Sequence, residues 1–257
     1  MTNSKANSPS SSQGRVIQTA VVLSGGMDSA TLLYDLVHDG HQCTALLFNY
    51  SQRHACELGY ATRLCAHQKV PYQLVDLTDV SHLFAGSSSQ VNKAVAVPDG
   101  HYTEDAMKVT VVPNRNMIML SLAVGYAVAH GMDNVAYGAH KGDHAIYPDC
   151  RASFVEAMQH AIGLCDWHPI KLLAPYLKLT KAEICKRGAE LGVPFADTWS
   201  CYNGDGKTHC GKCATCIERL ESFLLAGVPD PTNYAPMGQA YARKVLQDHC
   251  DAQAKQP

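Results

Sequence analysis

The stretch that decides the fold runs from Val21 to Leu33 and reads VVLSGGMDSATLL. An apolar run stops at a serine, two glycines and an aspartate, and apolar residues then return with helical spacing. Residues 16–23 have the composition of a buried strand, and residues 27–38 that of a helix that ends before Gly40. The order of strand, tight glycine turn and helix predicts the first unit of an α/β fold.

The alternation of strands and helices is repeated further along the chain. Residues 43–50 and 72–77 read as strands, with a helix over residues 53–68 between them. Residues 114–131 predict a long, largely buried helix and residues 134–140 a fourth strand. Such alternation is typical of parallel strands joined by crossover helices. We therefore expect a doubly wound, mainly parallel sheet with its ligand crevice beyond the carboxyl ends of the strands.

Changes of composition predict four segments. Residues 1–15 have no apolar h-region and read as a disordered leader, not as a signal peptide. Residues 16–195 form the α/β domain, residues 196–227 a cysteine-rich loop and helix, and residues 228–257 a tail that either reaches a partner subunit or frays. Within the α/β domain, residues 78–110 are too long and polar for an ordinary connection, and both a substrate lid and simple disorder fit them.

Composition excludes several classes of protein. The formal net charge of the 257 residues is -2, which argues against nucleic acid as an obligatory partner. No run approaches the roughly 18 apolar residues of a membrane span. The eleven cysteines are odd in number and mostly scattered, as buried free thiols are. We therefore expect a cytoplasmic protein in a reducing compartment.

The glycine turn has the features of an anion site. Backbone N–H groups at the start of a helix lack intrahelical partners, and the helix dipole adds positive charge there. Gly25 and Gly26 would let the main chain approach a phosphate, while Ser24 and Ser29 add hydroxyl donors. Asp28 could cap the helix or hold Mg²⁺. A plain strand-to-helix turn is the alternative, and neither common phosphate-loop pattern is present.

A second motif gathers four cysteines in the spacing C-x8-C-x2-C-x2-C, at Cys201, Cys210, Cys213 and Cys216. Four thiolates so close in sequence suit a tetrahedral, structural Zn²⁺ site with no position left for water. An iron–sulfur cluster and a redox pair are the alternatives. His209 is adjacent, but with four thiols available we place it outside the first coordination shell.

The turn SGGMDS resembles the pyrophosphatase (PP) loop of the N-type ATP pyrophosphatases. Together with the cysteine block, QRH at 52–54, RN at 115–116, YPDCR at 147–151 and TKAEI at 180–184, it makes the chain, from Val21 to Phe223, similar to the 7-cyano-7-deazaguanine synthase family. The chain departs from that family twice: it has FNYSQRH where the family often has F-D-Y-G-Q-R-H, and VPNRN where the family often has V-P-G-R-N.

The resemblance implies a fold, a reaction and a set of ligands. The fold would be of the adenine nucleotide alpha hydrolase-like kind, with a small C-terminal zinc-binding subdomain. The reaction would convert 7-carboxy-7-deazaguanine and ammonia to 7-cyano-7-deazaguanine (preQ0), with ATP and Mg²⁺, through adenylated acid and amide, releasing AMP and pyrophosphate. The nucleotide would bind to Leu23, Ser24, Gly25, Gly26, Met27, Asp28, Ser29, Ala30, Thr31, Leu32 and Leu33.

Roles for other residues follow from the same resemblance. Asp28, Arg115 and Lys181 would be catalytic, the latter two as cationic clamps on the pyrophosphate. The deazaguanine would be held by Asp143, Tyr147, Asp149 and Arg151, with carboxylates accepting from its N1–H and 2-amino group. Loop capping is an equal alternative for Asp149, and an ion pair with Glu156 for Arg151. His140 or His144 could help to deprotonate ammonium, although such histidines are more often hydrogen-bonded loop residues.

Three further readings stay open from sequence. A paralogue of the superfamily could adenylate a different carboxylate or a tRNA base. A non-catalytic zinc module could bind nucleotide or a partner protein. The chain would also form a homodimer by the general prevalence of two-fold oligomers.

Overall fold

Strand β1 (Gln18–Val22) lies in the middle of a parallel sheet in the computed structural model, which describes residues 15–254 except 85, 87, 102–106 and 146. The side chains at 144 and 145 are also outside the description. The predicted leader therefore falls, apart from Arg15, outside the described residues, as does the side chain of His144.

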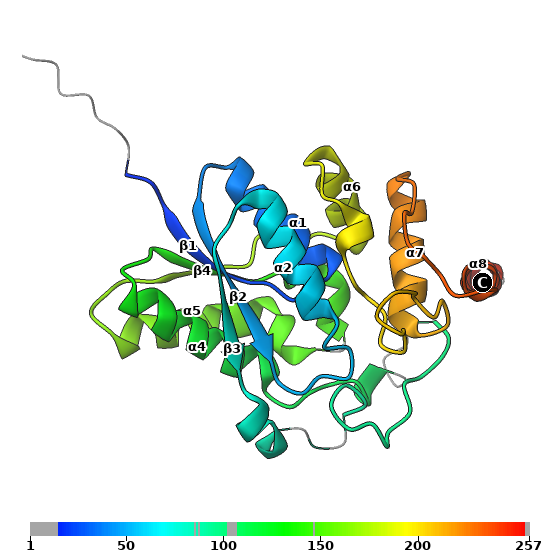
Figure 1. The fold of residues 1–257 in the computed structure, drawn as a ribbon, viewed down its shortest axis with the longest axis horizontal. Helices are drawn as coiled ribbons and strands as arrows, with labels where there is room; N and C mark the ends of the chain where they lie inside the picture. The colour runs from blue at the N-terminus through cyan, green and yellow to red at the C-terminus, as the bar shows by residue number, and fades with distance from the viewer. Residues whose placement is uncertain (1–14, 85, 87, 102–106, 146, 255–257) are drawn as a thin grey trace, which may run out of the picture.

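Five strands and seven longer helices make up the described part of the fold (Figure 1). The other strands are β2 (Gln42–Asn49), β3 (Tyr72–Asp76), β4 (Asn134–Ala136) and β5 (Lys171–Leu173). The helices are α1 (Met27–His38), α2 (Glu57–Gln68), α4 (Arg115–Ala129), α5 (Ala152–Cys165), α6 (Lys181–Glu190), α7 (Ala214–Ala226) and α8 (Gly238–Gln253). Short 3-10 turns are η1 (Thr78–Leu83), η2 (Lys141–Ala145), η3 (Pro148–Cys150) and η4 (Phe195–Asp197).

All strand pairs are parallel, and their order across the sheet is β3-β2-β1-β4-β5. The chain thus runs outward from β1 in one direction through β3 and in the other through β5. Helices α1, α2 and α6 cover one face, and α4 and α5 cover the other (Figure 1). The predicted doubly wound, mainly parallel α/β sheet is confirmed.

Successive residues of β1 belong to two hydrophobic cores, one on each face of the sheet. Ala20 packs with Leu120 and Met158 of the α4 and α5 layer, whereas Val21 packs with Leu32 and Ile184 of the opposite layer. Neighbouring side chains of a strand point to opposite faces, so a strand buried on both sides needs a continuous apolar run. This is why the sequence before the glycine turn contains no polar alternation.

The order of strands reverses between β1 and β4, and this reversal opens the crevice in which ligands of such sheets bind. The glycine turn follows β1, and residues 137–140 follow β4 on the other side of the crevice. A Cβ added to Gly138 would lie 3.3 Å from the backbone nitrogen of Ser29. The end of β4 therefore packs directly against the first turn of α1.

Several boundaries differ from the sequence-based expectation. Strand β4 ends at Ala136, four residues before the predicted end, although Tyr137 N–H still donates to Leu173 O of β5 at 3.1 Å. Helix α4 ends at Ala129, two residues before the predicted end, and helix α7 begins at Ala214, within the predicted cysteine-rich loop and helix. Helix α6 begins at a capping box within the TKAEI motif, in which Thr180 N–H donates to Glu183 Oε2 at 2.7 Å and Glu183 N–H donates to Thr180 Oγ1 at 3.3 Å.

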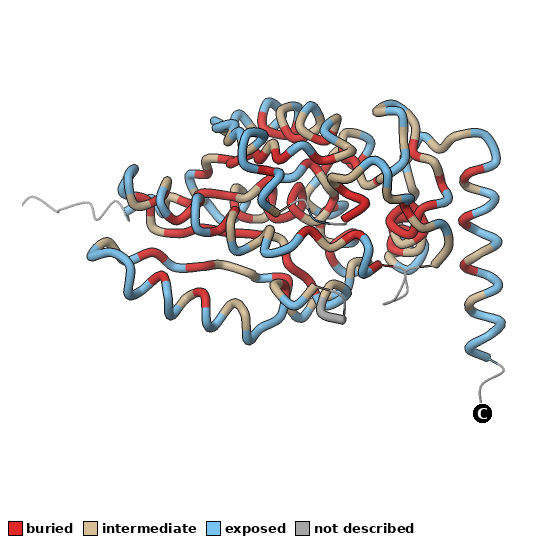
Figure 2. The backbone as a smooth tube through the Cα atoms, turned by 90° about the horizontal axis from the view of Figure 1, so that it is seen from below, coloured by how far each residue is buried: buried red, intermediate tan, exposed pale blue. Residues whose placement is uncertain are grey.

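The C-terminal segments lie at one end of the molecule. Helix α8 packs Ala242 and Leu246 against Ile217 and Leu220 of α7, and most of its remaining surface is exposed (Figure 2). The buried apolar residues of the predicted tail thus pack within the chain. None of the helices in the described residues is long and apolar enough to cross a lipid bilayer.

The excursion over residues 78–110 packs against other segments where it is described. Gly100 N–H donates to Lys212 O at 3.0 Å, and Arg53 donates to the carbonyls of Asn92 and Val95 at 3.2 and 2.8 Å. Ser88, Ser89 and Gln90 are buried. The described part of residues 78–110 therefore contacts both the segment that precedes α2 and the cysteine-rich loop.

The chain departs from the family pattern at three positions, of which Ser51 and Asn114 have left-handed backbone conformations and Asn49 is the last residue of β2. Ser51 has φ 63° and Asn114 has φ 57°, and at each the family often has glycine. Glycine adopts such angles without steric cost, and asparagine tolerates them better than serine. Backbone conformation thus explains the family's glycines at positions 51 and 114, whereas Asn49 stands where the family often has aspartate and its Oδ1 accepts from Ser51 N–H at 3.3 Å.

Candidate active site

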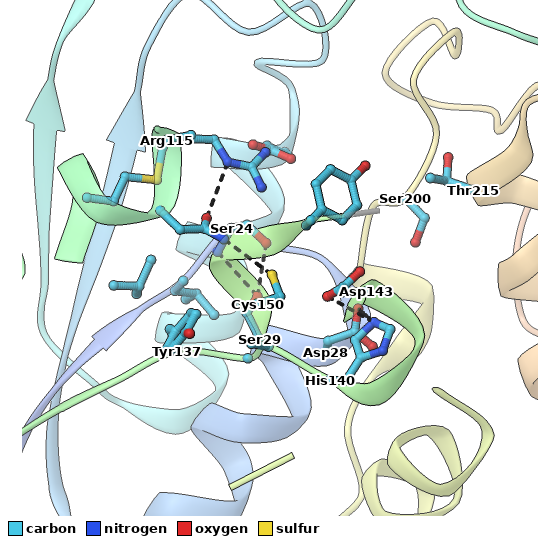
Figure 3. A pocket seen from close by; sticks show the side chains of 18 of the residues that line it. Ser24, Asp28, Ser29, Arg115, Tyr137, His140, Asp143, Cys150, Ser200 and Thr215 are labelled. Atoms are coloured by element: carbon cyan, nitrogen blue, oxygen red, sulfur yellow. Dashed lines mark hydrogen bonds and ion pairs between the residues drawn. The ribbon is translucent and has the colours of Figure 1, made fainter. Parts of the chain in front are cut away.

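A cavity of about 240 Å³ opens at the switch point of the sheet. Its walls come from the glycine turn, the segment after β4, the first turns of α2, α4 and α6, and the cysteine-rich segment with α7. Figure 3 shows Asp28, His140 and Asp143 gathered on one side, with Ser200 and Thr215 on the side of α7. The cavity therefore lies between the α/β sheet and the C-terminal part of the chain.

The glycine turn is closed by its own serines. Ser24 Oγ and Ser29 Oγ lie 3.1 Å apart, Gly26 N–H donates to Ser24 Oγ at 3.3 Å, and Ser29 Oγ donates to Gly26 O at 3.3 Å. Gly26 stands at the N-cap of α1 and has no side chain to satisfy the first N–H groups of the helix. The turn thus presents helix N–H groups and hydroxyls to the cavity, as an anion site requires.

The close packing of helix α2 requires glycine at position 25, whether or not a ligand is bound. Its φ is +85°, and an added Cβ would lie 2.5 Å from the backbone oxygen of Glu57 and 3.0 Å from the nitrogen of Ala61. The first turn of α2 therefore packs onto the glycine turn. This contact fixes the turn before any phosphate arrives.

Replacing Gly25 with alanine is expected to lower the free energy of unfolding by about 3 kcal/mol. The left-handed backbone conformation should cost an alanine about 1 kcal/mol, and the close contact of its Cβ with α2 about 1–3 kcal/mol. Gly40→Ala is the matched control, because Gly40 has φ +84° with no atom within 4 Å of the added Cβ. It should cost about 1 kcal/mol. Equal losses of stability in urea unfolding of the two variants would contradict the proposed contact.

A buried charge cluster stands beside the turn. Lys181 Nζ lies 2.8 Å from Glu218 Oε2 and 3.4 Å from Asp28 Oδ2. Burial lowers the pKa of Lys181, but the charges of Asp28 and Glu218 outweigh it and raise that pKa above its ordinary value. Burial raises the pKa of Asp28, yet Lys181 and His140 bring it below its ordinary value. At neutral pH the cluster therefore holds an ammonium between two carboxylates.

His140 lies between Asp28 and Asp143, with Nε2 at 3.8 and 3.5 Å from their Oδ2 atoms. Its Nδ1 accepts from Gly142 N–H at 3.1 Å. The hydrogen-bond pattern thus assigns the proton to Nε2, where it faces the two carboxylates. Burial raises the pKa of Asp143, although His140 and Lys181 act in the opposite direction.

A stability prediction follows from Asp143. Its pKa is higher in the folded than in the unfolded state, so its contribution to stability is full below the ordinary value of 3.8 and is lost as the pH rises through the folded value. Asp143→Asn should therefore stabilise the fold at neutral pH by on the order of 1 kcal/mol, or about 3 °C in Tm. Thermal unfolding at pH 4 and pH 7 checks this: the gain should shrink at the lower pH, and a loss of stability at pH 7 would contradict it. The exposed Asp39→Asn serves as control.

The structure brings together most of the residues that the sequence singled out. Leu23, Ser24, Asp28, Ser29, Arg115, Asp143, Tyr147 and Lys181 line the cavity. Gly25, Gly26, Met27, Ala30, Thr31, Leu32 and Leu33 belong to the turn and helix behind it without lining it, and several of them are core residues.

Two predicted substrate contacts lie elsewhere. Asp149 is not among the lining residues, and its Oδ2 accepts from Asn116 N–H at 3.2 Å, in the first turn of α4. Arg151 is exposed and stands at the N-cap of α5. The capping alternative considered for Asp149 thus matches its hydrogen bond.

Other lining residues were given no role from the sequence, although His54 belongs to the QRH motif. The cysteine-rich segment contributes Ser200, Tyr202, Thr215 and Glu218, and the α2 entry contributes His54 and Glu57. Thr215 and Glu218 are three residues apart on α7 and share one face. That spacing, on either side of the last cysteine, Cys216, was the available signal, but it identifies a face only once the helix is placed.

The four cysteines form one buried cluster. Their sulfur atoms all lie within 4.8 Å of one another, with Cys201 to Cys213 at 4.0 Å and Cys210 to Cys216 at 3.9 Å. A tetrahedral ion with metal–sulfur bonds of about 2.3 Å needs sulfur atoms about 3.8 Å apart. The described residues contain no other group of this kind. The predicted cysteine cluster is confirmed as a site that could hold a metal.

Backbone N–H groups surround these sulfur atoms. Cys201 Sγ accepts from the N–H of Asn203 at 3.3 Å and of Cys210 at 3.2 Å, and Cys210 Sγ accepts from Lys212 and Cys213 at 3.4 and 3.3 Å. Such donors stabilise thiolates and orient them.

His209 lies outside the four-sulfur group. Its ring packs on Trp199 with centroids 4.3 Å apart, and its Nε2 accepts from Ser200 N–H at 3.2 Å. Burial, together with the Arg219 charge, lowers the pKa of His209 to about 3. His209 is therefore a neutral packing residue between the cluster and the cavity wall.

Comparisons with known proteins agree on one family. The family model described as queuosine biosynthesis protein QueC matches residues 18–227. A 7-cyano-7-deazaguanine synthase of Methanoregula boonei is 49% identical over 220 residues, which cover 86% of this chain and 100% of that relative. Another of that name, from Hahella chejuensis, is 51% identical over 217 residues, covering 84% of this chain and 93% of the relative.

Among solved structures, the chain is similar to the U34-tRNA thiolase NcsA of Methanococcus maripaludis. The TM-score is 0.47 with 13% identity, over 94% of this chain and 74% of that one. This likeness is too distant to bear on function.

Proposed function

Because the chain belongs to the family of queuosine biosynthesis protein QueC, we propose that it converts 7-carboxy-7-deazaguanine to 7-cyano-7-deazaguanine with ammonia and ATP. The chain is an ATP-dependent ligase that forms a carbon–nitrogen bond. One observation carries the proposal: residues of the PP loop and of the cysteine-rich segment line the same cavity. Both segments lie within the 210 residues, 18–227, that the family model matches.

The chemistry explains why two activations are needed. A carboxylate oxygen attacks the α-phosphorus of ATP, and pyrophosphate leaves. Ammonia then adds to the acyl carbon, and AMP departs with the carboxylate oxygen to leave the amide. The amide oxygen repeats the attack on a second ATP. Loss of two N–H protons and of the second AMP gives the C≡N bond.

Residues of the cavity would stabilise the charge that moves in each activation. The N–H groups of the glycine turn, with the Ser24 and Ser29 hydroxyls, would hold the pyrophosphate. Lys181 would approach the departing phosphates from the α6 side, and Arg115 from the first turn of α4. Fixed donors that face developing charge in a dry site lower the barrier without reorganisation.

Mg²⁺ would accompany ATP, and Asp28 fits such an ion. Oδ2 of Asp28 faces Lys181, whereas its Oδ1 is buried and has no hydrogen-bond partner among the described residues. A free carboxylate oxygen beside a phosphate site is a suitable hard ligand. When bound, the ion would neutralise charge on the phosphates.

Zn²⁺ is the metal that we propose for Cys201, Cys210, Cys213 and Cys216. Four buried sulfur atoms at tetrahedral spacing, with N–H donors around them, match a closed structural site. The ion would fix the segment that carries Ser200, Tyr202 and Thr215 into the cavity wall.

Two properties of the whole protein complete the proposal. We expect a cytoplasmic enzyme, because all eleven cysteines are free of disulfides and a four-thiolate site needs reducing conditions. We also expect a homodimer, from the general prevalence of two-fold oligomers. Analytical ultracentrifugation of the purified chain tests the second expectation.

Incubation of the purified chain with ATP, Mg²⁺, ammonium and 7-carboxy-7-deazaguanine tests the proposed function. Mass spectrometry should show the nitrile, with AMP formed only when the acid is present. Accumulation of the amide alone would mean that the enzyme stops after one activation. No AMP with this acid, but AMP with another, would assign the chain to a paralogue with a different substrate.

A further inference from the structure

The proposed reaction needs a base that the charge cluster does not supply. Ammonia becomes positively charged at nitrogen when it adds to the acyl carbon, and that nitrogen must lose one proton before AMP leaves. The amide nitrogen loses two more before the nitrile forms. His140 cannot accept them in the observed arrangement, because Gly142 N–H occupies its Nδ1 and its Nε2 proton faces carboxylates.

A second histidine in the cavity wall, His54, also turns Nε2 toward a carboxylate but differs from His140 at Nδ1. His54 Nε2 lies 3.1 Å from Glu57 Oε2, and both side chains are only 9% exposed. A carboxylate can only accept, so Nε2 carries the proton and Nδ1 keeps a free lone pair. His54 Nδ1 is buried and has no hydrogen-bond partner among the described residues.

The carboxylate that orients His54 is itself fixed. Gln52 Nε2 donates to Glu57 Oε1 at 3.1 Å and to Phe48 O at 3.0 Å, while Gln52 Oε1 accepts from Tyr50 N–H at 2.9 Å. The backbone contacts at both ends of the amide fix its orientation, so Glu57 receives a donor on each oxygen. Base, orienting carboxylate and supporting amide thus form one chain of polar contacts, an ion pair at 3.1 Å followed by a hydrogen bond at 3.1 Å.

The series of contacts from His54 through Glu57 to Gln52 lies next to the glycine turn. Glu57 is the first residue of α2, and its backbone oxygen is the atom that Gly25 approaches. His54 and Glu57 line the same cavity as Ser24 and Arg115. An unpaired buried acceptor destabilises the fold, and a ligand N–H would remove that cost.

The geometry points to His54 as the catalytic base that removes protons from the substrate nitrogen, with Glu57 as its positioning residue. In the first half, His54 Nδ1 takes one proton from the ammonia adduct, and AMP leaves with the acyl oxygen. In the second half, it takes the N–H protons of the adenylated amide in turn, and the C–O bond breaks as C≡N forms. The imidazolium is held by Glu57 and returns each proton to solvent. This inference rests on the proposed function.

The test separates adenylation from proton removal. Attack of a carboxylate on ATP needs no base, so His54→Ala should keep the acid-dependent exchange of labelled pyrophosphate into ATP within about threefold. Conversion of supplied amide to nitrile should fall by about 10²–10³-fold. Added imidazole should restore part of this rate in His54→Ala.

Glu57→Gln gives an independent readout. An amide would donate to Nε2 and move the histidine proton to Nδ1, as an asparagine does in the serine protease triad. It should match His54→Ala in amide turnover but should not respond to imidazole. His67→Ala is the matched control, because His67 pairs with Asp197 at 3.0 Å on the surface, and its rates should not change.

Two results would overturn the assignment of the base. One is amide turnover in His54→Ala within threefold of the unmodified chain. The other is an equal fall in exchange and amide turnover, which would mean that His54 holds the nucleotide. Absence of acid-dependent exchange in the unmodified chain would overturn the proposed reaction, whatever the variants do.

Discussion

Lys181→Ala is expected to lower kcat for nitrile formation by about 10³-fold. The lysine is buried between Asp28 and Glu218 at the start of α6, and its pKa is raised, so it carries a positive charge throughout the neutral range. Its loss removes a cation from the pyrophosphate site and leaves carboxylates facing each other. Steady-state release of pyrophosphate with saturating acid and ammonium measures the effect.

Lys186→Ala provides the control on the same helix. Lys186 is exposed, so its loss should leave kcat within about twofold. Lys181→Ala should also lower Tm at neutral pH, and less so in acid, where the remaining carboxylates become protonated. A kcat for Lys181→Ala within tenfold of the unmodified chain would remove Lys181 from the proposed machinery.

Cys213→Ser is expected to remove the bound metal and several kcal/mol of stability. Cys213 is fully buried at the N-cap of α7, 4.0 Å from the sulfur of Cys201. Metal binding and folding of a structural site are coupled, so the loss of one thiolate should release the ion and loosen the cavity wall. Elemental analysis should find about one zinc per unmodified chain and less than about a tenth of that in the variant.

Cys43→Ala tests whether any buried thiol would behave in the same way. Cys43 is buried in the sheet, where burial raises the pKa of its thiol to about 12. This variant should keep its zinc and lose only about 1 kcal/mol. Iron and sulfide in place of zinc in the unmodified chain would contradict the proposed metal.

The elements that the sequence revealed are those whose signals are local. The apolar run before Ser24, the helical spacing after Asp28 and the Thr180 to Glu183 capping box each occupy fewer than twenty residues. The cysteine spacing is local as well, and its four sulfur atoms meet as expected. Local patterns of this kind follow from backbone geometry and hydrogen bonding within one element.

What the sequence did not reveal depends on contacts between distant segments. The three-residue strand β5 is too short for a pattern of its own and exists because it pairs with β4. The need for glycine at position 25 comes from α2, more than thirty residues away. Glu218 reaches Lys181 only because α7 packs on α6. No window of sequence contains both partners of such contacts.

His54 shows that a sequence motif can identify a residue without predicting its role. QRH was visible as part of the family likeness, but its role depended on Glu57, on the Gln52 amide and on a free Nδ1. Conversely, the choice between His140 and other bases required the Gly142 hydrogen bond. Protonation states are set by neighbours, so the sequence could suggest histidines but could not rank them.

The fate of the carboxylate oxygens tests the central claim most directly. The acid is prepared with ¹⁸O in both carboxylate positions and converted with ATP, Mg²⁺ and ammonium, and AMP and nitrile are analysed by mass spectrometry. We predict two AMP for each nitrile, each AMP carrying one ¹⁸O, because both oxygens leave on phosphorus. AMP without ¹⁸O, or a single labelled AMP for each nitrile, would contradict a double adenylation in this cavity.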